Sequence, residues 1–284
     1  MGSIEHRLGE RHLAGCIALA KSANWNQNEA DWRLMLGFGR GWGIALEDGT
    51  LAASTLVLPY NGFAWVAMVL VLPEHRKRGF ATRLLRTVLA DLKKKGQTAI
   101  LDATPAGHDV YAQEGFNDCW GFKRFALNSL SKDFSSKGKT RPIANNDWPS
   151  ILQLDAIAFG ASRETVLRNL AARLPEAALV AERGGKVAGF LLGRDGREAR
   201  QLGPLVAQDE QTARDLLELA LRKVGAPIYI DVTDRASNLQ SWILARGFVF
   251  QRPFTRMVHG ATAEAARAPG DASLVFCPAG PELG

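Results

Sequence analysis

The chain has 284 residues, of which 46% are apolar and 23% charged, and its formal net charge is +6. This composition is typical of a globular protein with one large domain or two ordinary ones, and it excludes a disordered or fibrous chain. Three scattered cysteines provide neither a disulfide framework nor a metal-ligand spacing, so we expect no metal. The positive charge favours anionic ligands without by itself indicating a nucleic acid.

The N-terminal residues are polar, and the sequence contains no apolar run long enough to span a bilayer. We therefore expect a cytoplasmic protein that makes no membrane contact.

The first part of the chain predicts two helices followed by antiparallel strands. Apolar residues recur at helical spacing in the first two segments, and turns such as Glu47-Asp48-Gly49 separate the later ones. The glycine-rich stretch 37–43 is interpreted as a loop that enters a strand, because no well-capped helix follows it. The predicted elements are helices over 11–22 and 29–36 and strands over 42–46, 51–60 and 65–72.

A basic turn joins the last of these strands to a helix. The turn His75-Arg76-Lys77-Arg78 is closed by Gly79, and helical spacing follows from Ala81 to Leu92. The first N–H groups of a helix have no partner inside it, and the macrodipole adds about half a positive charge there. Gly79 allows close approach that a Cβ would obstruct. The stretch predicts an anion-binding site, although a solvated surface loop has the same pattern.

A further strand over 99–103 carries Asp102, and a short helix carries Tyr111 and ends at Gly115-Phe116. A last strand is predicted over 120–127. The polar stretch 128–140 that follows is interpreted as an interdomain linker.

The second half of the chain repeats this order of elements. Both halves end on the pattern GF-x5-F-x-R, at Gly115 to Arg124 and at Gly247 to Arg256. The second copy lacks the glycine and the basic residues of the first turn, and Ile243 stands where the first half has Tyr111. We therefore interpret the second half as a non-catalytic duplicate. The apolar stretch 273–278 is expected to add a strand.

The spacing Val71-x-Pro73-x-x-Arg76-x-x-Gly79-x-Ala81 resembles the acetyl-CoA pyrophosphate motif of the GNAT N-acetyltransferase superfamily, V-x-P-x-x-[RQ]-x-x-G-x-[GA]. An intact first half and a degenerate second half, with Gly203-Pro204-Leu205-Val206-Ala207, resemble a bacterial tandem-GNAT type. The resemblance implies an α+β fold of two tandem GNAT-like domains, each a mixed, mainly antiparallel sheet flanked by helices. The expected parts are a catalytic domain over 1–127, a linker over 128–140 and a degenerate domain with a C-terminal tail over 141–284.

The resemblance also implies acetyl-CoA as the co-substrate. The backbone of the third strand would bind its pantetheine arm, and the basic turn with the start of its helix would bind the pyrophosphate. The residues so implied are Val69, Leu70, Val71, Arg76, Lys77, Arg78, Gly79, Phe80, Ala81 and Thr82.

Tyr111 lies in the pattern Tyr-x-x-x-Gly-Phe, which is similar to the position of the general-acid tyrosine of many GNAT enzymes. The amine would attack the thioester directly, and the alternative role for Tyr111 is packing. The identity of the general base is left open, because this strand has Trp65 where relatives often have a glutamate. Asp102 is a candidate for the base, and its alternative role is to cap the turn that follows its strand. The enzyme would need no base if it selected the free amine.

The acceptor is expected to be a small-molecule primary amine, in a pocket that the second half helps to cover. Its walls are predicted at Trp25, Trp32, Trp42 and Trp65, which are otherwise core residues. The alternatives are a protein or peptide acceptor, and a regulator that binds acetyl-CoA without turnover. We expect no nucleic-acid partner, because exposed interleaved aromatics and a nucleic-acid-binding motif are missing from the sequence. A monomer or homodimer is expected.

Overall fold

A computed structural model of the chain describes residues 3–129, 140–260 and 267–284. Most of the predicted linker, residues 130–139, and part of the predicted tail, residues 261–266, lie outside the described residues. The described residues divide into two compact units. Unit 1 contains residues up to 119 together with 196–198, 257–260 and 267, and unit 2 contains 120–195, 199–256 and 268–284.

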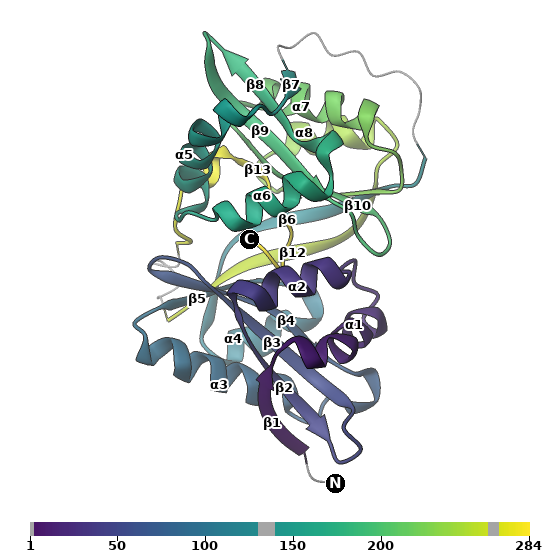
Figure 1. The fold of residues 1–284 in the computed structure, drawn as a ribbon, viewed down its shortest axis with the longest axis vertical. Coiled ribbons are helices and arrows are strands. Elements are labelled where there is room, and N and C mark those ends of the chain that lie inside the picture. The colour runs from purple at the N-terminus through teal and green to yellow at the C-terminus, as the bar shows by residue number, and fades with distance from the viewer. Residues whose placement is uncertain (1–2, 130–139, 261–266) are drawn as a thin grey trace. The chain divides into compact units, whose positions relative to one another are not determined.

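Unit 1 has the predicted order of two helices, antiparallel strands, and then strand, loop and helix (Figure 1). Its sheet also contains a strand that sequence patterning does not predict, at Ser3–Leu8, because polar residues alternate with few apolar ones along this edge strand. The elements are β1 (Ser3–Leu8), α1 (Leu13–Ser22), α2 (Glu29–Phe38), β2 (Arg40–Leu46), β3 (Leu51–Pro59), β4 (Phe63–Val71), α3 (Phe80–Lys94), β5 (Thr98–Ala103), α4 (Pro105–Gln113) and the start of β6 (Phe116–Leu127), with 3-10 turns at Glu10–His12 and Pro73–His75.

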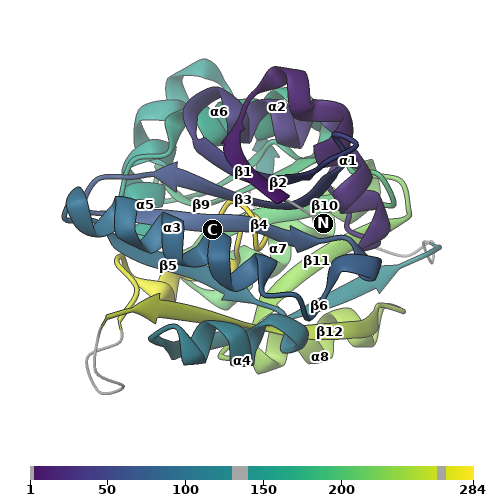
Figure 2. The same cartoon turned by 90° about the horizontal axis from the view of Figure 1, so that it is seen from below.

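The sheet of unit 1 is covered by helices on both faces. Figure 2 shows α1 and α2 on one face of β2, β3 and β4, and α3 on the other. The apolar stripe of α3, with Leu84, Leu85, Val88 and Leu92, is buried against this second face. Burial on both faces explains why β3 is almost continuously buried and apolar.

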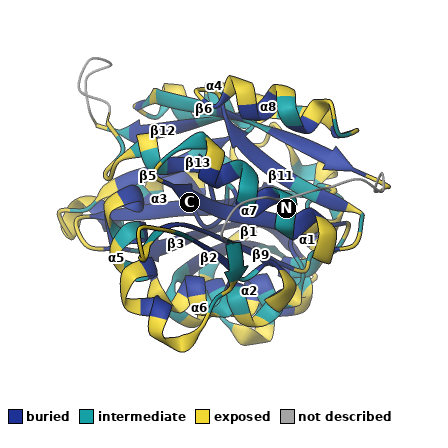
Figure 3. Cartoon of the chain, turned by 90° about the horizontal axis from the view of Figure 1, so that it is seen from above, coloured by how far each residue is buried: buried dark blue, intermediate teal, exposed yellow. Residues whose placement is uncertain are grey.

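Unit 2 repeats the element order of unit 1, which confirms the internal duplication. Figure 3 shows its strands buried, while its helices expose their outer faces. The elements are the rest of β6, β7 (Thr140–Pro142), α5 (Trp148–Phe159), α6 (Glu164–Arg173), β8 (Leu179–Arg183), β9 (Lys186–Arg194), β10 (Arg200–Ala207), α7 (Glu210–Lys223), β11 (Ile228–Thr233), α8 (Ser237–Leu244), most of β12 (Val249–His259) and β13 (Val275–Cys277), with 3-10 turns at Asn145–Asp147, Pro175–Ala177 and Ala272–Leu274.

The two units exchange strand ends. Residues 122–127 of β6, which close the first half of the sequence, pair antiparallel with β11 in unit 2. Residues 257–259 of β12, which close the second half, belong to unit 1, where Met257 joins the core against α3. The units are therefore not two consecutive pieces of chain.

Most of the strand pairs described in the two units are antiparallel, and the pairs β4 with β5 and β10 with β11 are parallel. This is the mixed, mainly antiparallel fold that the sequence predicts. Of the helices in the described parts of the chain, none combines the length and apolarity needed to cross a bilayer.

Candidate active site

Strand β4 contains a β-bulge. The pairing with β3 shifts between Leu56–Ala67 and Ser54–Leu70, so that β4 has one residue more than its partner. Met68, inside the bulge, has φ = 51°, and its carbonyl oxygen accepts a hydrogen bond of 2.8 Å from the buried hydroxyl of Ser54. A bulge re-aims the backbone groups that follow it, here those of Val69.

The same strand separates from its parallel neighbour. The pairing of β4 with β5 covers only three positions and ends at Trp65–Ile100, although β4 continues along β3 to Val71. Beyond Trp65, the edge of β4 that faces β5 has no strand beside it in the described part of unit 1. Backbone N–H and C=O groups on such an edge can bind an extended ligand as a further strand would.

The loop after β4 ends at an uncapped helix. Lys77 and Gly79 both have left-handed backbone conformations, with φ of 60° and 77°. Gly79 is the N-cap of α3, and a Cβ at this position would point into open space. For a residue other than glycine a left-handed conformation costs roughly 1–2 kcal/mol. The loop is thus held in a strained form that presents the first N–H groups of α3 outward.

The loop is also positively charged. Arg76, Lys77 and Arg78 are exposed, and in the part of the chain that the structure describes they form no salt bridge with an acidic side chain. Arg78 Nη1 lies 2.8 Å from Nδ1 of His75, whose ring stacks on Phe80 at 6.3 Å. Three uncompensated cations beside a helix N-terminus make this loop suited to binding a phosphate or pyrophosphate.

Tyr111 packs on the same core face as the loop and the bulged strand. Its partly buried ring lies against the α3 core cluster, together with Val69, Val71 and Phe80. Burial raises the pKa of the Tyr111 phenol well above its ordinary value of 10. The phenol is therefore protonated at neutral pH, and it can donate a proton or a hydrogen bond but cannot serve as a base.

Gly107 is required by this placement of Tyr111. A Cβ on Gly107 would lie 2.9 Å from Cε2 and 3.4 Å from the hydroxyl oxygen of Tyr111. The ring also meets Phe116 edge-on at 6.0 Å. The tyrosine is thus positioned by one turn of its own helix and by the strand that follows.

Asp102 lies on the other face of β5. Ala99, Leu101 and Ala103 belong to the α3 core, so the intervening Asp102 points to the opposite face, and it is partly buried. Trp65 of β4 is on that opposite face too, between Ala64 and Val66, which join the α3 core. Tyr111 and Asp102 therefore approach β5 from different sides.

The predicted tryptophan walls differ in accessibility. Trp32 and Trp65 are 0% and 1% exposed, and Trp42 is buried under the guanidinium of Arg7 at 4.1 Å. Trp25 is partly exposed. In this conformation only Trp25 offers surface to a ligand.

A contact near Trp25 has no signal in the sequence. Residues 196–198, from the loop between β9 and β10, belong to unit 1. Arg197 donates from its Nε to the carbonyl oxygen of Trp25 at 3.0 Å, and the amide of Glu198 donates to Oδ1 of Asn26 at 2.8 Å. In the sequence these residues have only the composition of a hairpin turn. They clamp the connection between α1 and α2.

The equivalent helix start in unit 2 is closed. Asp209 is the N-cap of α7, and its carboxylate accepts a hydrogen bond of 2.9 Å from the amide of Thr212. Arg183 pairs with the same carboxylate at 2.6 Å. An internal carboxylate thus fills the position that Gly79 leaves open at α3.

Two hollows described in unit 2 lie apart from the predicted residues. One, of about 520 Å³, lies between α5 and the β8–β9 turn, and the other, of about 10 Å³, adjoins the C-terminal segment. Among the described residues, no cluster of three or more His, Cys, Asp or Glu side chains is arranged to hold a metal.

Comparison with known proteins identifies the family. The model of the GNAT acetyltransferase family matches residues 11–116, and a model of a GNAT acetyltransferase domain matches residues 151–269, together well over half of the chain. The chain belongs to the GNAT acetyltransferase family, as an acyltransferase with two tandem GNAT domains.

The particular relatives are distant. The uncharacterized N-acetyltransferase YitH of Bacillus subtilis (strain 168) is 23% identical over 247 residues, which cover 85% of this chain and 86% of that protein. A proposed acetyltransferase of Pyrococcus horikoshii shares the fold over 100% of this chain and 96% of its own, with a TM-score of 0.81 and 20% identity. A tandem GNAT protein from the clavulanic acid biosynthesis pathway matches 95% of this chain and 100% of its own, with a TM-score of 0.61 and 15% identity. Identities this low establish the shared fold alone.

Proposed function

We propose that unit 1 transfers an acetyl group from acetyl-CoA to the primary amine of a small molecule. The observation that carries the proposal is the combination of a bulged strand that leaves its neighbour, an uncapped helix start and three unpaired cations. The loop suits the pyrophosphate of the donor, and the free edge of β4 suits the amides of its pantetheine arm. The GNAT family generally uses this donor.

The reaction needs two proton movements. The amine nitrogen attacks the thioester carbonyl carbon, and a backbone N–H after the Met68 bulge stabilises the developing oxyanion. The carbon–sulfur bond then breaks, the nitrogen loses a proton, and the thiolate gains one. An alkyl ammonium with a pKa near 10 is roughly one part in a thousand free amine at pH 7, which costs about 4 kcal/mol.

Tyr111 is assigned the role of stabilising the leaving thiolate. A phenol whose pKa is raised above 10 by burial is a weaker acid than a thiol with a pKa near 8.5, by about 2 kcal/mol or more. Complete proton transfer before the bond breaks is therefore unfavourable. The favoured role is a hydrogen bond that strengthens as charge develops on sulfur, while the thiolate takes its proton from water and Tyr111 keeps its own.

The acceptor is assigned to the α1–α2 side of unit 1. Arg197 and Glu198 clamp the connection between these helices, which favours a small acceptor over an extended polypeptide. The indole N–H of Trp32 and the amide oxygen of Gln27 are buried there, and neither has a hydrogen-bond partner among the described residues. A polar small molecule or water would satisfy both, since unpaired buried polar groups are unfavourable.

A cytoplasmic location is part of the proposal. Cys16, Cys119 and Cys277 are all free thiols in the structure. Free cysteines are compatible with the reducing compartment in which acetyl-CoA is used.

The test is an acceptor screen. The purified chain is incubated with acetyl-CoA and a panel of small amines, lysine peptides and N-terminal peptides, and free thiol is measured. Thiol release that depends on a small amine is expected. Release with peptides alone would replace the small molecule by a peptide acceptor, and donor binding without release on any amine would indicate a non-catalytic regulator.

A further inference from the structure

The C-terminal segment enters the sheet of unit 2. Strand β10 pairs with β11 at three positions, ending at Leu202–Ile230. Beyond that point β10 pairs antiparallel with β13, as Leu205 with Cys277 and Val206 with Val275. On the other side, the hydroxyl of Thr233 at the end of β11 donates to the carbonyl oxygen of Val275 at 3.3 Å. Strand β13 therefore lies in the opening between β10 and β11.

This opening corresponds to the one beside β4 in unit 1. Each parallel pair covers three positions, and each bulged strand has one residue more than its antiparallel neighbour, between Leu202 and Leu205 in β10. Val275 lies beside Val206 near the start of α7, and Pro278 contacts Gly203 deeper in the strand. The segment thus enters from the helix end of the opening, as the pantetheine arm is proposed to do in unit 1.

Buried contacts hold the segment along its length. Cys277, Ala279 and Leu283 are 0% exposed. Glu282 forms an ion pair with Arg194, and both side chains are almost completely buried. A single charge left in such a site without its partner is strongly unfavourable.

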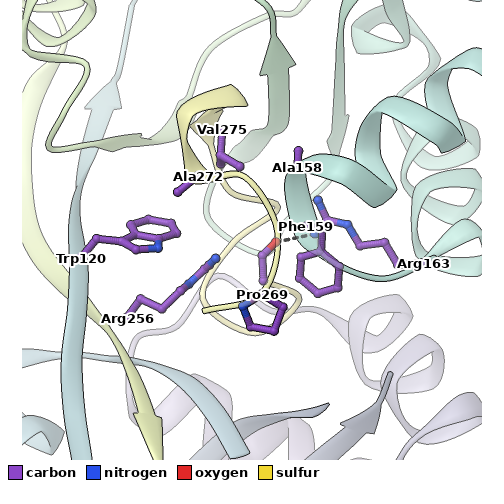
Figure 4. Close-up of a pocket in the computed structure, with 9 residues that line it drawn as sticks. Trp120, Ala158, Phe159, Arg163, Arg256, Pro269, Ala272 and Val275 are labelled. Carbon is purple, nitrogen blue, oxygen red and sulfur yellow. Dashed lines mark hydrogen bonds between the residues drawn. The ribbon is translucent and has the colours of Figure 1, made fainter. Parts of the chain in front are cut away.

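The end of the segment is fixed as well. Arg163, which also pairs with Asp155, donates to the carbonyl oxygen of Gly284, the dashed bond in Figure 4. Beside it, Val275 and Trp120 line the cavity of about 10 Å³, which holds at most one water molecule. The segment leaves no room for a second ligand at this point.

We propose that the opening between β10 and β11 is a peptide-binding site, and that its ligand is the segment Val275 to Gly284 of the chain itself. The ligand it takes is an extended apolar peptide followed by a glutamate that reaches Arg194. By occupying the opening, the segment excludes acyl-CoA from unit 2 and completes its core. The peptide site rests on contacts within unit 2 alone, and only the exclusion of acyl-CoA rests on the function proposed for unit 1.

The first test cuts the chain and leaves the segment in place. A protease site is inserted between Gly260 and Arg267, and the full-length protein is cleaved and passed over a size-exclusion column without denaturant. Co-elution of the C-terminal fragment with the rest of the chain is expected. Loss of the fragment from the cut chain would overturn the proposal.

In the cut protein the bound C-terminal fragment can also be exchanged for an added peptide. A fluorescent peptide of residues 271–284 should replace the bound fragment, and the same peptide with Glu282→Ala should bind at least about tenfold more weakly, since it lacks the carboxylate that forms the buried ion pair with Arg194. Equal binding of the two peptides, or of a scrambled peptide, would overturn the assigned site.

The second test uses Cys277 in the uncut protein. Cys277 is buried in β13, and burial raises the pKa of its thiol. Two variants each keep one cysteine: Cys16→Ala with Cys119→Ala keeps Cys277, and Cys16→Ala with Cys277→Ala keeps Cys119. Alkylation of Cys277 in the first is expected to be at least about a hundredfold slower than alkylation of Cys119 in the second. Comparable rates would show that the segment is not bound in the opening.

Discussion

Two residues at equivalent helix starts distinguish the two units. Gly79 leaves the first N–H groups of α3 uncapped and accessible, whereas Asp209 binds the amide of Thr212 at the start of α7. An N-cap side chain of this kind stabilises its helix by about 1 kcal/mol. Unit 2 thus uses its helix terminus for its own stability, and unit 1 leaves the same terminus free to bind an anion.

Gly79→Ala should weaken donor binding. The left-handed conformation disfavours alanine, and the new Cβ would occupy the open space in front of α3. We expect the KM for acetyl-CoA to rise about tenfold, which corresponds to about 1.4 kcal/mol.

The matched control is Gly62→Ala. Gly62 has φ = 84° and open space around its Cβ position, but it lies in the β3–β4 turn. Gly62→Ala should destabilise the protein about as much as Gly79→Ala does, and it should leave the KM for acetyl-CoA unchanged. Equal KM changes in the two variants would assign the effect to general destabilisation.

Tyr111→Phe removes the hydroxyl and keeps the ring packed on Phe116. Turnover should fall roughly ten- to a thousandfold, because the thiolate loses its donor. Acetyl-CoA affinity should change little, as measured by calorimetry on the same preparation. Unchanged turnover would remove Tyr111 from the mechanism and leave it a packing residue.

Asp102→Asn tests the base. Asp231 occupies the comparable place in unit 2, and there it forms a buried bidentate ion pair with Arg124. That comparison favours a structural role for Asp102 and a mechanism that selects free amine. The pH–rate profiles of wild type and variant should then have the same shape, with kcat/KM rising about tenfold per pH unit below the amine pKa. A profile that loses its acidic limb in the variant would make Asp102 the base.

At the scale of elements, α4 is held in place by two histidines with opposite pH responses. His108 of α4 bonds to Asp118 of β6 at 2.8 Å, and this contact raises its pKa. His259 lies edge-on to Phe116 at 5.1 Å, and burial lowers its pKa. Both contacts adjoin the strand that follows Tyr111.

Mutation can separate the two histidines, because their contributions to stability depend on pH in opposite directions. The contribution of His108 is fully present below pH 6.5 and is lost as the pH rises through its raised folded pKa. The contribution of His259 is present above pH 6.5 and is lost as the pH falls through its lowered folded pKa.

In urea unfolding between pH 5 and 9, His108→Asn should therefore be most destabilising at acidic pH and His259→Asn at neutral pH. The His108 effect should stay below about 1 kcal/mol, since the pair is partly exposed. Parallel curves for the two variants would contradict both assignments.

The elements that could be predicted from the sequence are those whose signals lie in neighbouring residues. The apolar periodicity of α3, the glycine that precedes it and the apolar stretch that forms β13 were all recognisable, because each depends on neighbouring residues. The bulge at Met68 and the separation of β4 from β5 were not derivable from composition, since they depend on pairing between distant segments. The resemblance to the GNAT family implied only that the backbone of this strand would bind the pantetheine arm.

At the scale of the whole molecule, the chain does not divide where its sequence repeat divides. The end of β12 contributes Met257 to the core of unit 1, and the clamp of residues 196–198 also comes from the second half. A repeat in the sequence indicates duplicated elements but does not show which copy each strand joins. The second half is thus part of unit 1 as a structural component.

One acetyl-CoA per chain is the expected stoichiometry. In unit 2 the helix start is capped by Asp209 and the strand opening is filled by β13, whereas unit 1 has neither feature in its described residues. Isothermal titration should give one site, and Arg76→Ala with Arg78→Ala should raise its Kd at least about tenfold, at about 1 kcal/mol for each lost charge. Arg168→Ala with Arg183→Ala, which removes two exposed charges from unit 2, should leave the Kd within about twofold. Two sites per chain, or equal losses in both double variants, would show that the open helix start of α3 does not select the donor.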